Sequence, residues 1–153
     1  MRTLARPRDK DEIRRRLRHV RPESAGRWGR MSAHQMVCHL SDSFRMAMGR
    51  KPVSPAASLL QRTIVKWTAL YLPLRWPGGI PTRPEIDQCA GGGTRPTEFT
   101  ADVAELEALL ELFTAPARSF DWEPHPTFGP LSDATWLRWG YLHMDHHLRQ
   151  FGA

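Results

Sequence analysis

Three histidines fall within five positions near the end of the chain, at His143, His146 and His147. His143 and His147 are four residues apart, which on a helix places their Cβ atoms about 5–6 Å from each other on one face. That spacing lets two imidazoles bind one cation at roughly 2.0–2.1 Å. A catalytic site of the zinc type uses three protein ligands and an open position, so a third ligand has to come from another segment. The pair is therefore a candidate for two ligands of a metal site, and surface or capping histidines are the alternative that this spacing leaves open.

The helix that carries this pair is expected to begin at Ser132, a favourable N-cap, and to continue to about Phe151. At about 100° per residue, one stripe of this helix spans an arc of about 80° and consists of Trp136, Gly140, His143, His147 and Gln150. An apolar stripe lies beside it and consists of Leu137, Tyr141, Met144, Leu148 and Phe151. The histidine stripe thus borders the core face. His146 points away from it, and is either an alternative to His147 or a histidine that does not ligate.

A third ligand is available on a second expected helix, which begins after the N-cap Ser32 and ends at Gly49. His39 is a polar residue that borders the packing face of this helix, so it can meet the histidine pair if the two helices are neighbours. Asp42 follows on the same face, where its carboxylate could accept the second N–H of a ligating histidine or handle a proton. Further candidates to line the pocket are Gln35, His125, Trp136, His146 and Gln150.

The rest of the sequence predicts helices that are separated by loops. Three further helices are expected, over residues 9–20, from Pro55 to Tyr71, and from near Phe99 to a point before Pro116. Residues 73–96 hold five prolines and five glycines and therefore predict a long loop. No segment alternates apolar and polar residues for long enough to indicate a strand. We expect an all-α fold, a bundle of four long helices with an extra inserted helix, in one domain over residues 1–153 with a flexible tail at residues 1–8.

The charge of the chain is concentrated at its start. The formal net charge is +6, and residues 1–30 carry eleven Lys and Arg against four Asp and Glu. Such a basic segment could contact a nucleic acid or another partner, which makes a non-catalytic helical binding module the alternative function. The same pattern also fits a solvated helix face, and nucleic acid is not the first expectation.

The cysteines and the apolar segments bear on location. Cys38 and Cys89 lack the spacing of a disulfide framework or of a zinc knuckle, so a reduced, cytoplasmic setting is expected. The first residues contain no apolar stretch of the secretory type. The longest apolar region is interrupted by Arg62, Lys66 and Pro73, which argues against a transmembrane helix.

Two segments carry a resemblance to a known family. The stretch "HQMVCHLSDSF", residues 34–44, and the stretch "HPTFGPLSDATWLRWGYLHMDHHLRQFG", residues 125–152, resemble the DinB-like superfamily of four-helix-bundle metalloproteins. The likeness is closest to a branch whose function is not established. By this resemblance, His39, His143 and His147 would be the metal ligands, with water in the open position. Zinc or nickel is the metal that the resemblance implies, and imidazole suits either.

The resemblance also implies a chemistry. Characterised relatives include thiol S-transferases that use bacillithiol and isomerases that use mycothiol, in which the metal activates a low-molecular-weight thiol. We therefore expect a metal-dependent enzyme that acts on a small molecule, either a thiol-dependent transferase or a hydrolase, because a bound divalent cation lowers the pKa of a thiol or of water. A protein that kept the ligands and lost the reaction would have the same sequence pattern. Relatives are often homodimers, so a homodimer is expected here.

Overall fold

The computed structural model describes residues 1–56, 58 and 60–153, and within these ranges it contains helices and no strand. The helices are α1 (Pro7–Leu17), α2 (Ala33–Ala47), α3 (Lys66–Tyr71), α4 (Phe99–Phe113) and α5 (Asp133–Gln150), with a π-helical turn η1 (Gln61–Val65) and a 3₁₀ turn η2 (Pro84–Ile86). The extended pairing that is described is one isolated bridge between His125 and Gly129. The expected all-α class is confirmed for this part of the chain.

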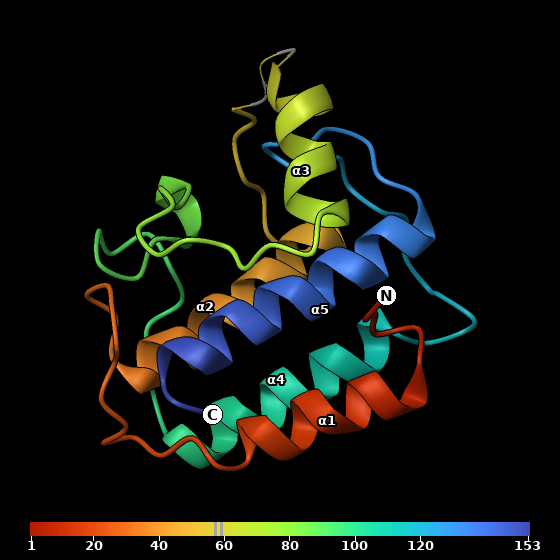
Figure 1. Cartoon of the computed structure of the whole chain (residues 1–153). Helices are drawn as coiled ribbons and strands as arrows, with labels where there is room; N and C mark the ends of the chain where they lie inside the picture. Colours follow the sequence, from red (N-terminus) through yellow and green to blue (C-terminus); the bar gives the residue numbers. More distant parts are fainter. Residues whose placement is uncertain (57, 59) are drawn as a thin grey trace.

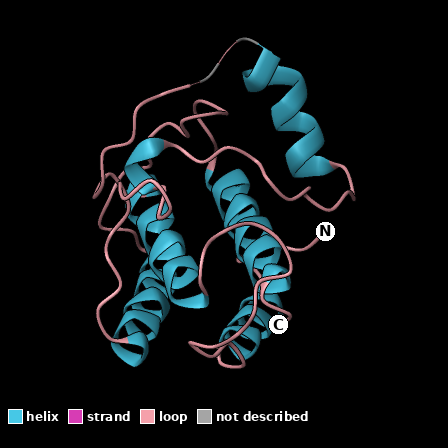
Figure 2. Cartoon of the chain, turned by 90° about the vertical axis from the view of Figure 1, so that its left-hand side faces the viewer, coloured by secondary structure: helices cyan, strands magenta, loops and turns pink. Residues whose placement is uncertain are grey.

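The helix α5 is the element around which the others are placed. It packs against α1, α2 and α3, and α2 packs in turn against α4. Figure 1 shows α2 and α5 running alongside each other, with α1 and α4 below them. In Figure 1 and in the turned view of Figure 2, α3 projects away from the other helices. A residue on the α2-facing side of α5 can therefore meet a residue of α2, as a site shared by both helices requires.

The ends of α2 and α5 are set by residues that the sequence predicts. The Ser32 side chain accepts a hydrogen bond from the backbone N–H of Gln35, and the Gln35 side chain accepts one from the N–H of Ser32. This reciprocal capping box fixes the start of α2. Gly49 follows the helix with a φ of 71°, in the left-handed region that glycine tolerates best. At the start of α5, the Ser132 side chain accepts a hydrogen bond from the N–H of Thr135.

The helical segment that contains α3 begins later than the sequence predicts. The expected start at Pro55 is wrong, because residues 54–56 are not helical and the N–H of residue 56 is bonded to a loop carbonyl. A capping box forms at Ser58 instead, since Ser58 and Gln61 exchange the hydrogen bonds that cap a helix. Ala57 and Leu59, which also belong to the predicted helix, lie outside the described residues.

Two other segments differ from expectation. The first helix begins at Pro7, two residues before the predicted start, because proline is well suited to the first turn. It ends at Leu17, three residues before the predicted end. The expected flexible tail is in part ordered, because Leu4 is buried and its N–H donates to the carbonyl of Leu137 on α5. Residues 73–96 are irregular apart from η2, as the sequence predicts.

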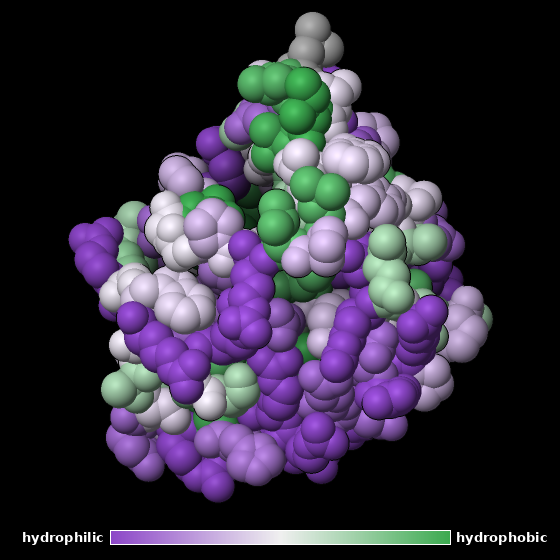
Figure 3. Space-filling view, viewed as in Figure 1, coloured by the Kyte–Doolittle hydropathy of each residue, from purple (hydrophilic) through white to green (hydrophobic). Residues whose placement is uncertain are grey.

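The surface of α3 and of the turn before it is unusually apolar. Figure 3 shows hydrophobic side chains gathered over this projection. Leu60, Ile64 and Trp67 are 57%, 61% and 58% exposed, whereas Leu70 is fully buried. This segment is therefore attached to the rest of the protein mainly at its C-terminal end.

Gly140 allows α5 to approach its neighbours closely. A Cβ atom at this position would lie 2.8 Å from Leu4 Cδ1 and 2.9 Å from Phe113 Cε1, which is closer than such contacts normally come. The side chains of Leu4 and Phe113 therefore occupy the space that a larger residue at position 140 would need.

We predict that Gly140→Ala destabilises the protein. At an open helical position this change stabilises by about 1 kcal/mol, because alanine is the better helix former. Here overpacking should outweigh that gain and lower the free energy of unfolding by about 1–3 kcal/mol. Urea denaturation measures the change, and an increase in stability would contradict the packing described.

Candidate metal centre

Three imidazole rings from two helices converge on one point. His39 on α2 and His143 and His147 on α5 have ring centroids 4.8–5.3 Å apart. One ring nitrogen from each lies within 4.8 Å of the other two. His39 and His147 are buried, and His143 keeps the most contact with solvent. The juxtaposition of one residue of α2 with two of α5, on which the sequence-based hypothesis depends, is therefore present.

The separation of the ring nitrogens fits a shared cation. The Nε2 atoms of His39 and His143 are 3.3 Å apart. Two nitrogens bound at 2.0–2.1 Å to one tetrahedral ion are about 3.3–3.4 Å from each other, by simple geometry on the usual zinc–nitrogen distance. The donor set, three imidazoles without a carboxylate, suits zinc or nickel better than a hard cation such as magnesium.

Hydrogen bonds to the other ring nitrogens orient two of the three histidines. The Nδ1 of His39 lies 3.0 Å from the carbonyl oxygen of Ile86, and the Nδ1 of His147 lies 2.9 Å from the side-chain oxygen of Gln150. Both partners only accept, so each Nδ1 carries the proton and each Nε2 keeps a free lone pair. The Gln150 amide is fixed in turn, because its Nε2 donates to the carbonyl oxygen of Trp28 at 2.7 Å. Such outer partners hold a ligating histidine in one tautomer and one orientation.

The surroundings keep all three imidazoles neutral. Burial lowers the pKa of His39, and it lowers the pKa values of His143 and His147 further, with the neighbouring histidines acting in the same direction. The cause is that a low-dielectric site disfavours the charged ring, and that several rings at one point cannot be charged together. At neutral pH the site therefore offers lone pairs, and not positive charge, to anything that enters it.

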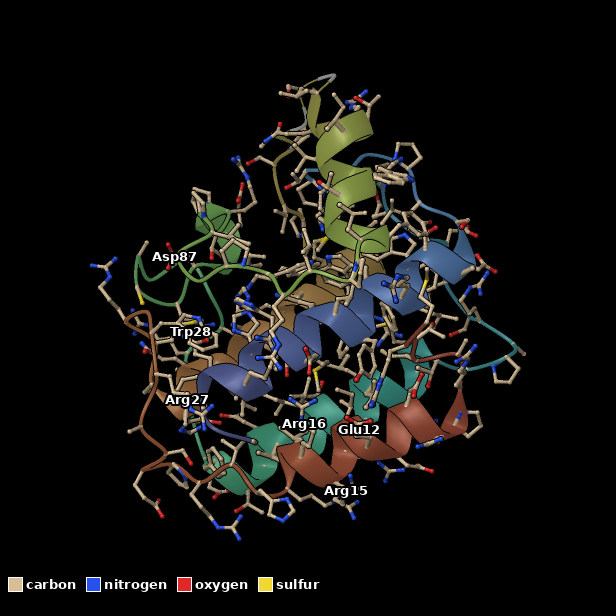
Figure 4. The ribbon with its side chains drawn as sticks, viewed as in Figure 1. Glu12, Arg15, Arg16, Arg27, Trp28 and Asp87 are labelled. Carbon is tan, nitrogen blue, oxygen red and sulfur yellow. The ribbon has the colours of Figure 1, made fainter. Side chains whose placement is uncertain are left out.

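Aromatic residues from two loops wall the site. The ring of Trp76 lies 6.2 Å from that of His143 and 6.1 Å from that of His146, and Trp28 lies 5.6 Å from His146. A Cβ atom at Gly78 would lie 2.8 Å from Trp28 Cδ1, so the two loops touch each other. Figure 4 shows Trp28 and Asp87 on separate loops on the same side of the α2–α5 pair. Trp28 and Trp76 therefore cover His146, and Trp76 also covers one side of His143.

A family model covers almost the whole chain. It matches residues 6–153, and its description is protein of unknown function (DUF1569). The chain belongs to the DUF1569 family. No curated protein and no solved structure shows significant similarity to this DUF1569 chain. Among its described helices, none is long and apolar enough to cross a membrane.

Asp42 of this DUF1569 protein is fully buried, and its contacts fix a loop. Its carboxylate accepts hydrogen bonds from the N–H and the hydroxyl of Thr94 at 2.7 and 2.6 Å, and it pairs with Lys51 at 3.1 Å. Arg45 approaches the same carboxylate at 3.4 Å. Asp42 therefore attaches the end of the 73–96 loop to α2. Among the described contacts, no hydrogen bond joins it to the three histidines, and its role in handling a proton stays a prediction.

The remaining pocket candidates have different surroundings. Gln150 supports His147, whereas Gln35 is part of the α2 cap. His146, which the sequence places off the histidine stripe as a pocket candidate, is buried beside His147, with ring centroids 5.0 Å apart. Its Nδ1 has no hydrogen-bond partner among the described atoms. Trp136 is fully buried and packs on Trp139, which in turn lies 4.7 Å from His143.

Three contributors are not marked by the sequence, and all of them lie between the long helices. Residue type alone does not assign Trp28 or Trp76 to the site, and Ile86 acts through its backbone carbonyl. A loop residue has no helical period that would show which way it points. A carbonyl oxygen is present at every position, so residue type could not have identified Ile86.

His125 lies in the loop before α5 and is held in its neutral form. Burial lowers its pKa to about 3. Its Nδ1 accepts the N–H groups of Thr127 and Phe128, each at 3.1 Å, and a proton on Nδ1 would remove both hydrogen bonds. The ring stacks on Phe128 with centroids 4.5 Å apart.

We predict that this histidine makes stability fall in acid. The unfolded chain takes up a proton near pH 6.5 and the folded chain does so only near pH 3, so the contribution is complete above pH 6.5 and is lost as the pH falls. The slope is at most about 1.4 kcal/mol per pH unit. Denaturation of metal-free protein at pH 7 and pH 5 should show a shallower loss for His125→Asn, whose side-chain oxygen can replace the Nδ1 acceptor. An equal loss in both proteins would contradict this origin.

Proposed function

We propose that this DUF1569 protein is a metal-dependent enzyme in which His39, His143 and His147 hold one divalent cation, zinc or nickel. The observation that carries the proposal is the 3.3 Å approach of two Nε2 atoms, together with the outer hydrogen bonds that turn the lone pairs of His39 and His147 toward the same point. The cluster of three histidines could hold a divalent metal by its donor set and spacing.

The arrangement of the helices supports membership of the DinB-like superfamily. We take α1, α2, α4 and α5 as the four helices of such a bundle, in one domain, with the segment around α3 as the inserted helix. This assignment rests on the packing of α2 against α4 and α5, and of α1 against α5. It also rests on the resemblance of the two histidine segments to that superfamily.

The chemistry follows from the charge of the site. A divalent cation bound by three neutral imidazoles supplies Lewis-acid chemistry and lowers the pKa of a thiol or of water at its open position. The protein's part is to hold the three imidazoles in place, to keep them neutral and to restrict the entry of bulk water. Thiol S-transfer to a small molecule is the first choice of reaction and hydrolysis the second.

A reacting thiol would have to come from a co-substrate. The sulfur of Cys38 faces α4, where it lies 3.7 Å from a carboxylate oxygen of Asp102. Burial, together with that carboxylate, raises the pKa of Cys38 to about 12, so the thiol is protonated at neutral pH. Cys89 is exposed on the 73–96 loop. Trp28 and Trp76 at the wall favour a substrate with an apolar part.

The alternative, a module that binds through its basic N-terminus, has less support. Arg14 and Arg18 of the α1 region pair with glutamates of α4, and Arg16 pairs with Asp145 of α5 at 2.7 Å. Figure 4 shows Arg16 and Glu12 on the side of α1 that faces α5, with Arg15 on the other side. Several arginines of the basic segment are therefore already paired with acidic residues of α4 and α5. Cytoplasmic location and the homodimer stay predictions.

We predict that His143→Ala loses one equivalent of bound metal. Two imidazoles remain in this variant, and two ligands rarely hold a catalytic cation. Elemental analysis of the purified proteins measures the loss. His19→Ala is the matched control, because His19 is exposed, follows the end of α1 and is not one of the three clustered histidines. Equal metal content in wild type, His143→Ala and His19→Ala would contradict the proposal.

The reaction itself is tested by a thiol-transfer screen. Wild type, His143→Ala and His19→Ala are incubated with low-molecular-weight thiols and small electrophiles, and the loss of free thiol is followed. We expect turnover in wild type and in His19→Ala and none above background in His143→Ala. Turnover that is unchanged in His143→Ala would exclude the histidine site as the place of reaction.

We also predict that Gln150→Ala weakens metal binding. The change removes the acceptor that fixes the tautomer of His147, and the loss of such a partner typically costs 10–100-fold in affinity. Competition with a chromophoric chelator measures the affinity. Gln61→Ala, which removes an amide at the start of η1, is the control and should bind as wild type does. An affinity within about twofold of wild type for Gln150→Ala would show that the Gln150 contact does not support the site.

A further inference from the structure

A second group of potential ligands lies on the opposite side of α2. It consists of His34 and Cys38 on α2 and Asp102 in the first turn of α4. The Nε2 of His34 is 2.7 Å from Oδ2 of Asp102, and the Sγ of Cys38 is 3.7 Å from the same oxygen. One donor atom from each residue lies within 4.8 Å of the other two.

The spacing on α2 repeats that of the histidine pair on α5. His34 and Cys38 are four residues apart, so they occupy one face of the helix one turn apart. The third donor comes from the helix that packs against this face, because α4 is the neighbour of α2. Two donors from one helix and one from its neighbour is again the arrangement that lets three side chains reach one ion.

The three side chains are held in place by their surroundings. The Asp102 carboxylate accepts hydrogen bonds from the backbone N–H and the hydroxyl of Thr97, at 2.9 and 3.2 Å. The His34 ring packs edge-on against Phe99, with centroids 5.3 Å apart. Cys38 is buried, whereas the side chains of His34 and Asp102 are each 20% exposed. An ion and a water ligand can therefore reach the donors from solvent.

We infer that His34, Cys38 and Asp102 form a second site for a divalent cation of the zinc type, separate from the three-histidine centre. Imidazole, thiolate and carboxylate are all zinc ligands, and two donors at the usual zinc–sulfur and zinc–oxygen distances are about 3.5 Å apart, close to the 3.7 Å between Cys38 and Asp102. On binding, the His34 ring changes tautomer: Nε2 gives up to solvent the proton that it donates to Asp102, and Nδ1 takes one up, so that the Nε2 lone pair is free to ligate. The distance between His34 Nε2 and Asp102 Oδ2 opens by about 0.6 Å to the tetrahedral separation, and the thiol proton of Cys38 passes to solvent. The ion would join α2 to α4 beside the segment that carries His39.

Cobalt(II) is the probe that distinguishes the two sites, because only the second site contains sulfur. Full-length protein is freed of metal with a chelator and titrated with Co²⁺ alone. We expect a sulfur-to-cobalt charge-transfer band in the near ultraviolet that is complete by two equivalents in wild type, where both sites take up Co²⁺, and by one equivalent in His143→Ala. The band should persist in His143→Ala and in Cys89→Ser, and it should be absent from Cys38→Ser. Its presence in His143→Ala shows that the second site stands whether or not the three-histidine centre binds metal.

A second variant, Asp102→Asn, tests the site independently in case Cys38→Ser does not fold. Asp102→Asn changes a partly exposed carboxylate and keeps an oxygen for Thr97, so we expect a helical circular-dichroism spectrum like that of wild type. The same variant should bind Co²⁺ at the sulfur site more than about tenfold more weakly. Loss of a residue that only hydrogen-bonds to a ligand already lowers metal affinity by about 10–100-fold, and Asp102 is a proposed ligand itself. Absence of the band in wild type, its loss in Cys89→Ser, or unchanged affinity in Asp102→Asn would overturn the proposal.

Discussion

The approach of three uncharged imidazoles inside the α2–α5 interface is the constraint on which the rest of the structure depends. Ring nitrogens are costly to bury unless each is bonded or points at something that will bond it. The protein meets this cost on the outer side of His39 and His147, whose Nδ1–H groups donate hydrogen bonds to the Ile86 carbonyl oxygen and the Gln150 side-chain oxygen. The inner nitrogens face one another with their lone pairs unpaired. This arrangement is unfavourable in an apolar core and becomes favourable when a cation binds the lone pairs.

The long loop between α3 and α4 is part of this arrangement. Its carbonyl at Ile86 orients His39, and its far end is attached to α2 through Thr94 and the buried Asp42. The close contact of Gly78 with Trp28 joins the same loop to the segment before α2. The loop is therefore ordered by polar contacts with α2 and by aromatic contacts with its neighbour. Few of its side chains enter the apolar core.

Most of the helices and the three-histidine cluster could be predicted, because both follow from the helical spacing of residue types along the sequence. Ser32 and Ser132 mark the starts of α2 and α5, and the spacing of His143 and His147 gives the shared face. The start of the segment at Ser58 was missed because Pro55 offers an equally favourable first turn, and a tertiary hydrogen bond decided between them. The burial of His146 could not be predicted, because two loops without a period cover it.

The weak attachment of α3 has a consequence for the way into the site. The projecting side chains of Leu60, Ile64 and Trp67 meet water whether this segment is docked or not, so they contribute little to holding it. What holds α3 is the buried Leu70, whose carbonyl accepts from Arg138. Trp76 is connected to this segment, since its indole N–H donates to the carbonyl of Ala69 at 2.8 Å. Local unfolding that detaches α3 would therefore remove Trp76 from its place beside His143, while α1, α2, α4 and α5 stay folded.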